Sequence, residues 1–170
     1  MATSPGLSLS EYITTNYRPD REYVDGEVRD RNVGKWEHAR LQALLASWFG
    51  SQEKSWSVKV ATGQRVQASL TRVRIPDVML VSRGPQPEVA VDPPMLVVEI
   101  LSPDDTYTET QSRSADYLHM GVPCVWIIDP TSRTGRQCIG DAWTAADKLA
   151  VPGTKIWVDL LRLFADLDEK

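Results

Sequence analysis

Two acidic residues stand in segments that otherwise have the composition of buried β-strands. Glu99 interrupts the apolar run of residues 95–101, and Asp77 follows Pro76 in the segment RIPDVMLV. A carboxylate rarely enters a protein core unless hydrogen bonds, a cation or a proton compensates for its lost hydration. Both acids are therefore expected to meet partners inside the fold.

The two acids could bind one metal ion together, because neighbouring strands could bring them to one edge of a sheet. Two hard carboxylate oxygens, a backbone carbonyl and water form the kind of Mg²⁺ or Mn²⁺ site used in phosphoryl chemistry. The alternative is that Asp77 caps the turn at Pro76 while Glu99 pairs with an arginine inside the fold. Spacing alone favours this second reading, since structural ion pairs also perturb carboxylates.

The N-terminal part predicts a short helix, a hairpin and a long helix. Capping-box spacing begins the first helix in residues 8–17, and Asp25-Gly26 suits a tight turn inside residues 22–28. In residues 36–49 apolar side chains recur with i, i+3, i+4, i+7 spacing, and Gly50 offers a stop.

The acids themselves should lie in the sheet that follows. Residues 56–68 predict a pair of strands, and residues 73–81 continue the sheet with an edge or a bulge at Pro76, which would re-aim Asp77. A strand around Glu99, a helix over 106–120 and an apolar strand in 122–129 then predict a parallel pair. Further short strands and a C-terminal helix follow. This order is typical of an α/β protein.

Composition fits one ordinary domain spanning residues 1–170, with residues 1–7 as a flexible tail. The chain has 170 residues, 42% of them hydrophobic and 25% charged. No apolar stretch approaches the roughly 20 residues of a membrane span, and the first residues do not resemble a signal peptide, so a cytoplasmic location is expected. The two cysteines, Cys124 and Cys138, are expected to serve core packing.

Charge limits how the chain could bind nucleic acid. The net charge is −4, so any contact with DNA or RNA must use a local basic patch. Arg65, Arg72 and Arg74 could form such a face, or they could be a solvated rim.

An ordered set of motifs resembles a known family. The segments EYVDGEV, WEHARLQALL, RIPDVMLV, LVVEILSPDDT and DYLHMGVPCVWIIDP are similar to the bacterial putative restriction endonuclease family, long catalogued as a domain of unknown function, of the PD-(D/E)XK nuclease superfamily. The resemblance covers residues 8–164. It implies a restriction-endonuclease-like α/β fold, with a mixed central β-sheet flanked by α-helices. It also implies cleavage of nucleic-acid phosphodiester bonds with Mg²⁺ or Mn²⁺.

The resemblance assigns roles to three residues. Asp77 becomes the PD aspartate and Glu99 the acid of (D/E)XK, both as metal ligands. Leu101 stands where the motif has lysine, and in this family the lysine comes instead from the next helix, at the position of Arg113. Arginine could stabilise charge on a phosphate but cannot act as a base, because it stays protonated. The alternative is an Arg113–Glu99 ion pair that only satisfies the buried acid.

Two further positions match the family less distinctly. Glu22 corresponds to an acidic position before the D-G turn and could reach the metal pocket, although a solvated hairpin residue is an equal reading. His38 matches a family histidine, but a lone helix histidine is more often a hydrogen-bonded structural group.

Two functions follow from these observations. The first is a metal-dependent endonuclease acting on nucleic acid, with DNA as the expected substrate. The second is a nuclease-fold binding or assembly module without catalysis, which the missing lysine and the acidic composition suggest. A homodimer is expected because six tryptophans leave apolar surface that one small domain has difficulty covering, and because double-strand cleavage commonly uses paired sites.

Overall fold

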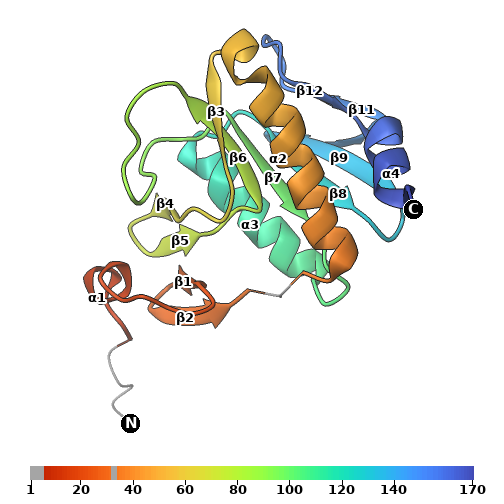
Figure 1. Cartoon of the computed structure of the whole chain (residues 1–170). Coiled ribbons are helices and arrows are strands. Elements are labelled where there is room, and N and C mark those ends of the chain that lie inside the picture. Colours follow the sequence, from red (N-terminus) through yellow and green to blue (C-terminus); the bar gives the residue numbers. More distant parts are fainter. Residues whose placement is uncertain (1–5, 32–33) are drawn as a thin grey trace.

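A mixed six-stranded sheet forms the centre of the computed structural model, which describes residues 6–31 and 34–170 (Figure 1). Its strand order is β10-β9-β8-β7-β6-β3. The strands are β3 (Val58–Ala61), β6 (Val78–Ser82), β7 (Leu96–Ile100), β8 (Val125–Asp129), β9 (Thr134–Ile139) and β10 (Ala142–Ala145). β7 and β8 are parallel, as predicted, and the other neighbours are antiparallel. Because parallel neighbours need a crossover, the chain passes from β7 to β8 through a helix.

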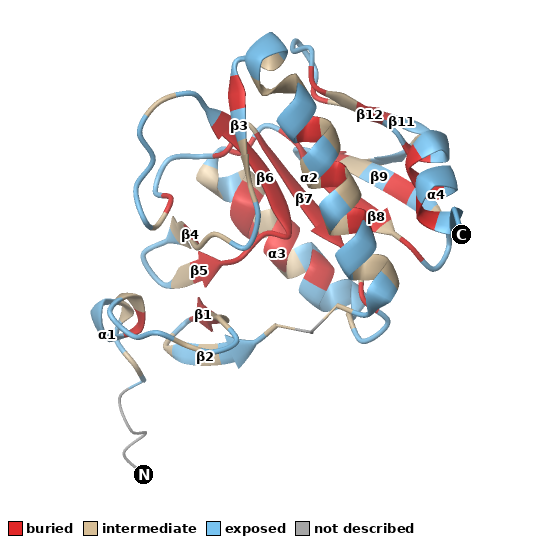
Figure 2. Ribbon diagram, in the orientation of Figure 1, coloured by how far each residue is buried: buried red, intermediate tan, exposed pale blue. Residues whose placement is uncertain are grey.

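Helices cover both faces of this sheet. They are α2 (Trp36–Trp56), α3 (Tyr107–Met120) and α4 (Leu160–Asp168), whereas α1 (Leu9–Ile13) packs against the smaller sheet described below. Alternate side chains of β7 point to opposite faces: Leu96 and Val98 pack in the core under α2 and α4, whereas Val97 packs with Tyr117 of α3. Figure 2 shows the buried strands between α2 in front and α3 behind. Glu99, two residues after Val97, therefore lies on the α3 side of the sheet.

A smaller sheet carries the remaining strands of the N-terminal half. Its order is β2-β1-β5-β4, with β1 (Arg21–Val24), β2 (Glu27–Asp30), β4 (Val66–Ser69) and β5 (Arg72–Arg74). Tyr23 and Val73 pack against Tyr12 of α1. Glu22 and Arg74 are next to Tyr23 and Val73 along their strands, so their side chains point to the opposite face of the small sheet, where they are buried. α3 lies against β4 of this sheet. The small sheet thus presents charged residues to α3. A two-stranded sheet of β11 (Lys148–Ala150) and β12 (Trp157–Asp159) precedes α4.

Several predicted boundaries differ from the structure. The long helix does not stop at Gly50; α2 continues to Trp56 and ends where Ser57 adopts the left-handed conformation. The first helix begins with the predicted capping box but ends at Ile13. Local propensity does not set the end of α2, because Phe49 and Trp56 pack against the core and extend the helix by nearly two turns.

Pro76 separates two sheets instead of bending one strand. β5 ends at Arg74 in the small sheet, and β6 begins at Val78 in the interior of the main sheet. β3 and β4 are likewise found in different sheets. Proline cannot donate to a ladder, so the break between β5 and β6 is where the chain changes sheets.

The predictions for the cysteines, the N-terminal tail and membrane-spanning helices have different outcomes. Both cysteines are buried in the core, as predicted. Of the tail expected over residues 1–7, residues 1–5 lie outside the described residues, whereas Leu7 is hydrogen bonded to Gly26 and to Tyr23 and so is not part of a free tail. Within the described residues, none of the helices has the length and apolar character needed to cross a membrane.

Candidate active site

Asp77 and Glu99 meet at the carboxyl end of β7. Asp77 stands just before β6, and its Oδ2 accepts a hydrogen bond of 2.7 Å from the backbone N–H of Ile100. Glu99 is the preceding residue on β7, and each acid is 3% exposed. The sheet change at Pro76 therefore directs Asp77 toward the end of the neighbouring strand. The two residues that the sequence suggested as a pair are brought together.

The guanidinium of Arg31 bridges the two acids. Its Nη2 lies 2.7 Å from Oδ1 of Asp77 and 3.7 Å from Oε2 of Glu99. Arg31 follows directly after β2 of the small sheet, so this contact ties the two sheets together at the acids. No pattern in the sequence singles out Arg31, because its role depends on how the small sheet packs.

His38 supplies a third contact to Asp77. Its Nε2 is 3.3 Å from Oδ1 of Asp77, and Gln42, one turn later on α2, donates to the Asp77 carbonyl at 2.8 Å. Gly34 allows the imidazole to pack closely, since a Cβ there would lie 2.3 Å from Nδ1 of His38. Burial alone would raise the pKa of Asp77, but the contacts with His38 and Arg31 and the hydrogen bond from the Ile100 amide hold it below its usual value. Asp77 is thus an ionised acid.

Glu99 has a different environment. The hydroxyl of Tyr117 on α3 donates to Oε1 of Glu99 at 2.9 Å, and both residues are buried. Burial raises the pKa of Glu99 to about 8, and the negative charge of Asp77 adds to the rise, while Arg31 opposes it. The two acids therefore have pKa values shifted in opposite directions, a feature common at sites that perform acid–base or metal chemistry.

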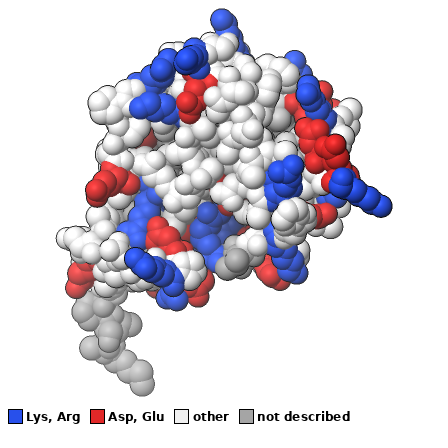
Figure 3. Space-filling view, viewed as in Figure 1, with Lys and Arg blue, Asp and Glu red and all other residues white. Residues whose placement is uncertain are grey.

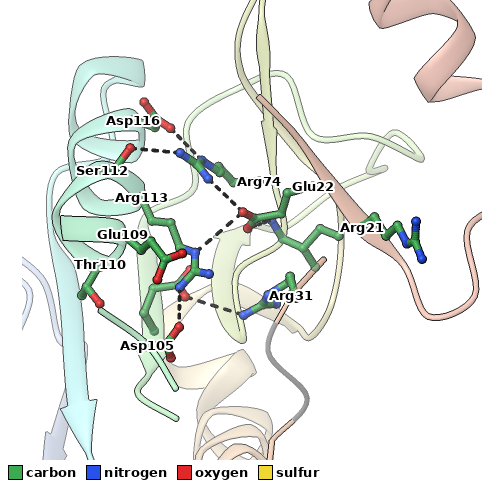
Figure 4. A network of polar contacts seen from close by, with 12 residues as sticks. Arg21, Glu22, Arg31, Arg74, Asp105, Glu109, Thr110, Ser112, Arg113 and Asp116 are labelled. Atoms are coloured by element: carbon green, nitrogen blue, oxygen red, sulfur yellow. Dashed lines mark hydrogen bonds and ion pairs between the residues drawn. The ribbon is translucent and has the colours of Figure 1, made fainter. Parts of the chain in front are cut away.

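Arg113 lies beside the acids but does not form the ion pair with Glu99 that was considered from the sequence. Its Nη1 donates to Asp105 at 3.0 Å, and its Nε lies 3.7 Å from Oε2 of Glu22 (Figure 4). That Nε is buried without a hydrogen-bond partner in the described structure. Asp105 sits between β7 and α3, where its carboxylate also accepts from the N–H and hydroxyl of Ser102. Arg113 is thus positioned by two carboxylates and retains an unused donor.

Glu22 is a buried member of the same charge network. Arg74 and Arg113 approach its carboxylate from two directions, and the backbone N–H of Ile75 donates to it at 3.2 Å (Figure 4). The reading of Glu22 as a solvated hairpin residue is wrong, because it is 2% exposed. Its position on β1, facing α3, brings it to the edge of the site.

The expected basic face does not form from the three arginines proposed for it. Arg65 pairs with Asp20, whereas Arg72 and Arg74 both pair with Asp116 on α3. Figure 3 shows basic and acidic side chains intermixed over the lower part of the molecule. Arg74 is only 4% exposed, so it is neither a binding surface nor a solvated rim.

A pocket of about 240 Å³ borders the acids on the outside. It is lined by Lys35, Trp36, Glu37, His38, Leu101, Pro103, Pro130 and Thr131. His38 contacts Asp77, and Leu101 follows Glu99 by two residues, so the pocket adjoins the acidic pair. Trp36 is 76% exposed at its edge. The pocket thus reaches the site at His38, while neither Asp77 nor Glu99 lines it.

The donor atoms suit a hard divalent cation. In the part of the chain that the structure describes, no three His, Cys, Asp or Glu side chains form a metal-binding group. Mg²⁺, however, usually keeps several waters and binds proteins through one or two carboxylates together with substrate phosphate. Asp77 and Glu99 both direct an oxygen at the positively charged Arg31. Two carboxylates around one cationic position therefore fit such an ion.

Comparison with protein families gives a match over residues 9–137, to the model described as Uma2, putative restriction endonuclease. The chain belongs to the Uma2 family. The matched region contains every candidate site residue discussed above, from Glu22 to Tyr117. The Uma2 match ends inside β9, so β10, α4 and the two-stranded sheet lie beyond it.

Solved structures support the Uma2 fold. The chain is similar to a crystal structure described as a putative nuclease belonging to DUF820 from Anabaena variabilis, with a TM-score of 0.84, 21% identity, and coverage of 95% of this chain and 99% of that chain. This likeness shows the restriction-endonuclease-like fold predicted from the sequence. A DrdV–DNA complex matches with a TM-score of 0.43 and 16% identity, over 76% of this chain and 11% of that chain, which is too low to carry an argument. A search of curated proteins gave no match.

Proposed function

We propose that this Uma2-family protein is a Mg²⁺- or Mn²⁺-dependent endonuclease that hydrolyses phosphodiester bonds of DNA. The observation that carries the proposal is the convergence of two buried acids, Asp77 and Glu99, on one cationic position at the end of β7. The family description gives the reaction class. A divalent cation at this position would polarise a phosphate and lower the pKa of bound water.

The chain's own residues have distinct roles in this proposal. Asp77 and Glu99 would hold the metal. His38 orients Asp77 through its Nε2, while Ile100 fixes the other Asp77 oxygen. Arg113 has a buried Nε without a hydrogen-bond partner among the described residues, and this donor would stabilise charge that develops on the phosphate. Glu22 and Asp105 keep the Arg113 side chain in place.

A general base is not assigned to any of these side chains. Arg113 stays protonated, and Leu101 occupies the position of the motif lysine. Proton transfer would therefore use solvent water. The missing motif lysine is consistent with the second function, a DNA-binding module without catalysis. If no hydrolysis is observed, this departure from the family motif favours that module.

Substitution of either acid tests the proposal directly. Asp77→Asn and Glu99→Gln should each reduce Mg²⁺-dependent cleavage of plasmid and oligonucleotide DNA by at least about a hundredfold, because each removes one of two metal ligands. Glu88→Gln is the matched control, since Glu88 is exposed and lies outside the site. Circular dichroism should show that the variants are folded.

Assays of the wild-type protein and of Asp77→Asn show which result would contradict the proposed nuclease. If purified protein binds single-stranded and duplex DNA but cleaves neither of them in the presence of Mg²⁺ or Mn²⁺, the binding-module function replaces the nuclease. If Asp77→Asn retains full activity, another site is responsible.

A further inference from the structure

The guanidinium of Arg31 occupies the position that a cation shared by the two acids would need. Its Nη2 lies 2.7 Å from Asp77 and 3.7 Å from Glu99, and the Arg31 side chain is only 18% exposed. When both acids are ionised, two buried carboxylates without a cation repel each other, so a single positive group between them lowers the energy of the metal-free fold.

Arg31 differs from the other buried arginines in its partners. Arg74 pairs with Glu22 and Asp116, and Arg113 pairs with Asp105 and Glu22, so both remain neutralised whatever happens at the acidic pair. Within the described residues, the ion pairs of Arg31 are those with Asp77 and Glu99 alone. Moving Arg31 away from the acids would therefore break no other ion pair.

Coordination of a metal ion is incompatible with this position of Arg31. Mg²⁺ approaches oxygen ligands to about 2.0–2.1 Å, and a guanidinium between the same oxygens repels a divalent cation through its own positive charge. One site cannot hold both.

We propose that Arg31 is the resident counter-ion of the acidic pair, and that a divalent cation binds Asp77 and Glu99 only by displacing its guanidinium. The inference rests on the metal site of the proposed function and adds a residue that sets its affinity. Arg31 then weakens metal binding by the free protein. The displaced guanidinium gains a new role next to the metal, because it can pair with a phosphate there.

Metal titration of a variant tests this competition. Arg31→Gln should bind Mn²⁺ about tenfold or more tightly than the wild type in isothermal titration calorimetry, since removing the competing charge favours the divalent ion. The titration is carried out at pH 8.5, which limits competition between protons and Mn²⁺ for the two carboxylates. Arg29→Gln is the matched control, because Arg29 lies on β2 two residues before Arg31, with an exposed side chain that pairs only with the exposed Glu27 among described residues. It should bind as the wild type does.

A measurement on the wild type avoids any effect of the substitution on folding. In nitrogen-15 NMR spectra, the Nε–H signal of Arg31, assigned through its own backbone, should shift on addition of Mg²⁺ as the guanidinium leaves the acids. The Nε–H of Arg74, held by Asp116 at 2.7 Å, should stay in place.

The outcomes separate the two proposals. Tighter binding by Arg31→Gln together with a moved Arg31 signal supports the inference. Equal or weaker binding by Arg31→Gln, or an unmoved Arg31 signal at saturating Mg²⁺, overturns the role of Arg31 but leaves the metal site intact. No binding heat in any of the three proteins, with no Mg²⁺-dependent shift, rejects the metal site itself and the inference with it.

Discussion

At the scale of single residues, the environment of Glu99 determines how the site behaves without metal. The sequence predicted that a buried acid in an apolar strand needs a partner, and this is correct. The partner was predicted to be a metal or Arg113, yet the structure places the Tyr117 hydroxyl and the Arg31 guanidinium beside it. Tyr117 comes from α3 and Arg31 from the small sheet, so no local pattern around Glu99 could reveal them.

Glu99→Gln should change the pH dependence of stability in metal-free protein. The pKa of Glu99 is raised by burial, and further by Asp77, to about 8, compared with 4.5 for an ordinary glutamate. The native state therefore holds a proton that the unfolded chain releases between these two pH values. The free energy of unfolding then falls as pH rises through this window, by about 1.4 kcal/mol for each pKa unit of difference. Glutamine has no such proton to lose.

Urea unfolding at pH 5 to 9 in the presence of EDTA measures this effect. The Glu99→Gln variant should gain stability relative to the wild type as pH rises, and its advantage should be largest above pH 8. Glu88→Gln should follow the wild-type curve. Parallel curves for wild type and Glu99→Gln would mean that Glu99 is ionised throughout, with Arg31 as a sufficient partner.

At the scale of elements, the start of α3 both caps a helix and positions an arginine. Thr106 forms a capping box with Glu109, as expected for a helix beginning near residue 106. Just before it, Asp105 accepts hydrogen bonds from Ser102 and Arg113. The helix could be predicted from sequence because capping and periodicity are local. The Asp105–Arg113 contact could not, since it depends on the path of the loop after β7.

Asp105→Asn should destabilise the fold by about 1 to 3 kcal/mol at neutral pH, because it removes the charge that faces buried Arg113. Burial alone would raise the pKa of Asp105, but the hydrogen bonds from Ser102 and the contact with Arg113 lower it below 3.8. The stabilisation is therefore fully present above pH 4 and is lost as pH falls through the lowered pKa. The difference from wild type should shrink accordingly in acid.

Thermal unfolding of Asp105→Asn and of the neighbouring Asp104→Asn provides the comparison, since Asp104 is exposed. Only the first should melt at lower temperature at pH 7. Equal melting temperatures for both variants would show that Arg113 does not need Asp105.

The N-terminus of α2 presents an aromatic side chain beside the site. Trp36 is 76% exposed at the edge of the pocket that includes His38. If DNA enters through this pocket, a base next to the cleaved phosphate can stack on the indole. Stacking of one base on an aromatic side chain contributes about 1 to 3 kcal/mol. Trp36→Ala should therefore weaken oligonucleotide binding by roughly ten- to a hundredfold.

Fluorescence anisotropy with labelled oligonucleotides measures this loss in a Glu99→Gln background, which prevents cleavage. Leu70→Ala, at an exposed apolar position between β4 and β5, is the control and should bind normally. Unchanged affinity in Trp36→Ala would place the DNA path elsewhere.

At the scale of the whole molecule, the order of elements was predictable but their division into two sheets was not. The parallel pair β7 and β8 follows from strand, helix and strand in sequence. The divergence of β3 from β4, and of β5 from β6, arises because the break at Pro76 and the turn at Gly63 let each strand join a different partner. Strand periodicity specifies which face of a strand is buried, not which neighbour it pairs with. The site depends on this division, since Glu22 lies in the small sheet and Arg31 directly follows its strand β2.

Self-association is predicted from apolar surface between α2 and α4. Leu44, Trp48, Trp157 and Leu163 line an open pocket of about 260 Å³ there, and Leu161 nearby is 65% exposed. Light scattering should give about twice the monomer mass of 19.0 kDa. Leu161→Glu should shift the equilibrium toward monomer by placing a charge at this surface. A mass of 19.0 kDa at every concentration would contradict the dimer.

The hydrogen bond from the Ile100 amide to Asp77 makes one backbone proton a reporter of the site's charge. Most strand amides donate a hydrogen bond to the carbonyl of a neighbouring strand, and the electron density on that carbonyl hardly changes when a ligand binds. This one is bound by a carboxylate, so its resonance frequency and its rate of exchange with deuterium follow the electron density on that oxygen. Any event that draws charge from Asp77 is therefore visible at Ile100. Binding of a cation to the two acids can therefore be followed by spectroscopy at this amide, without attaching a reporter group to the chain.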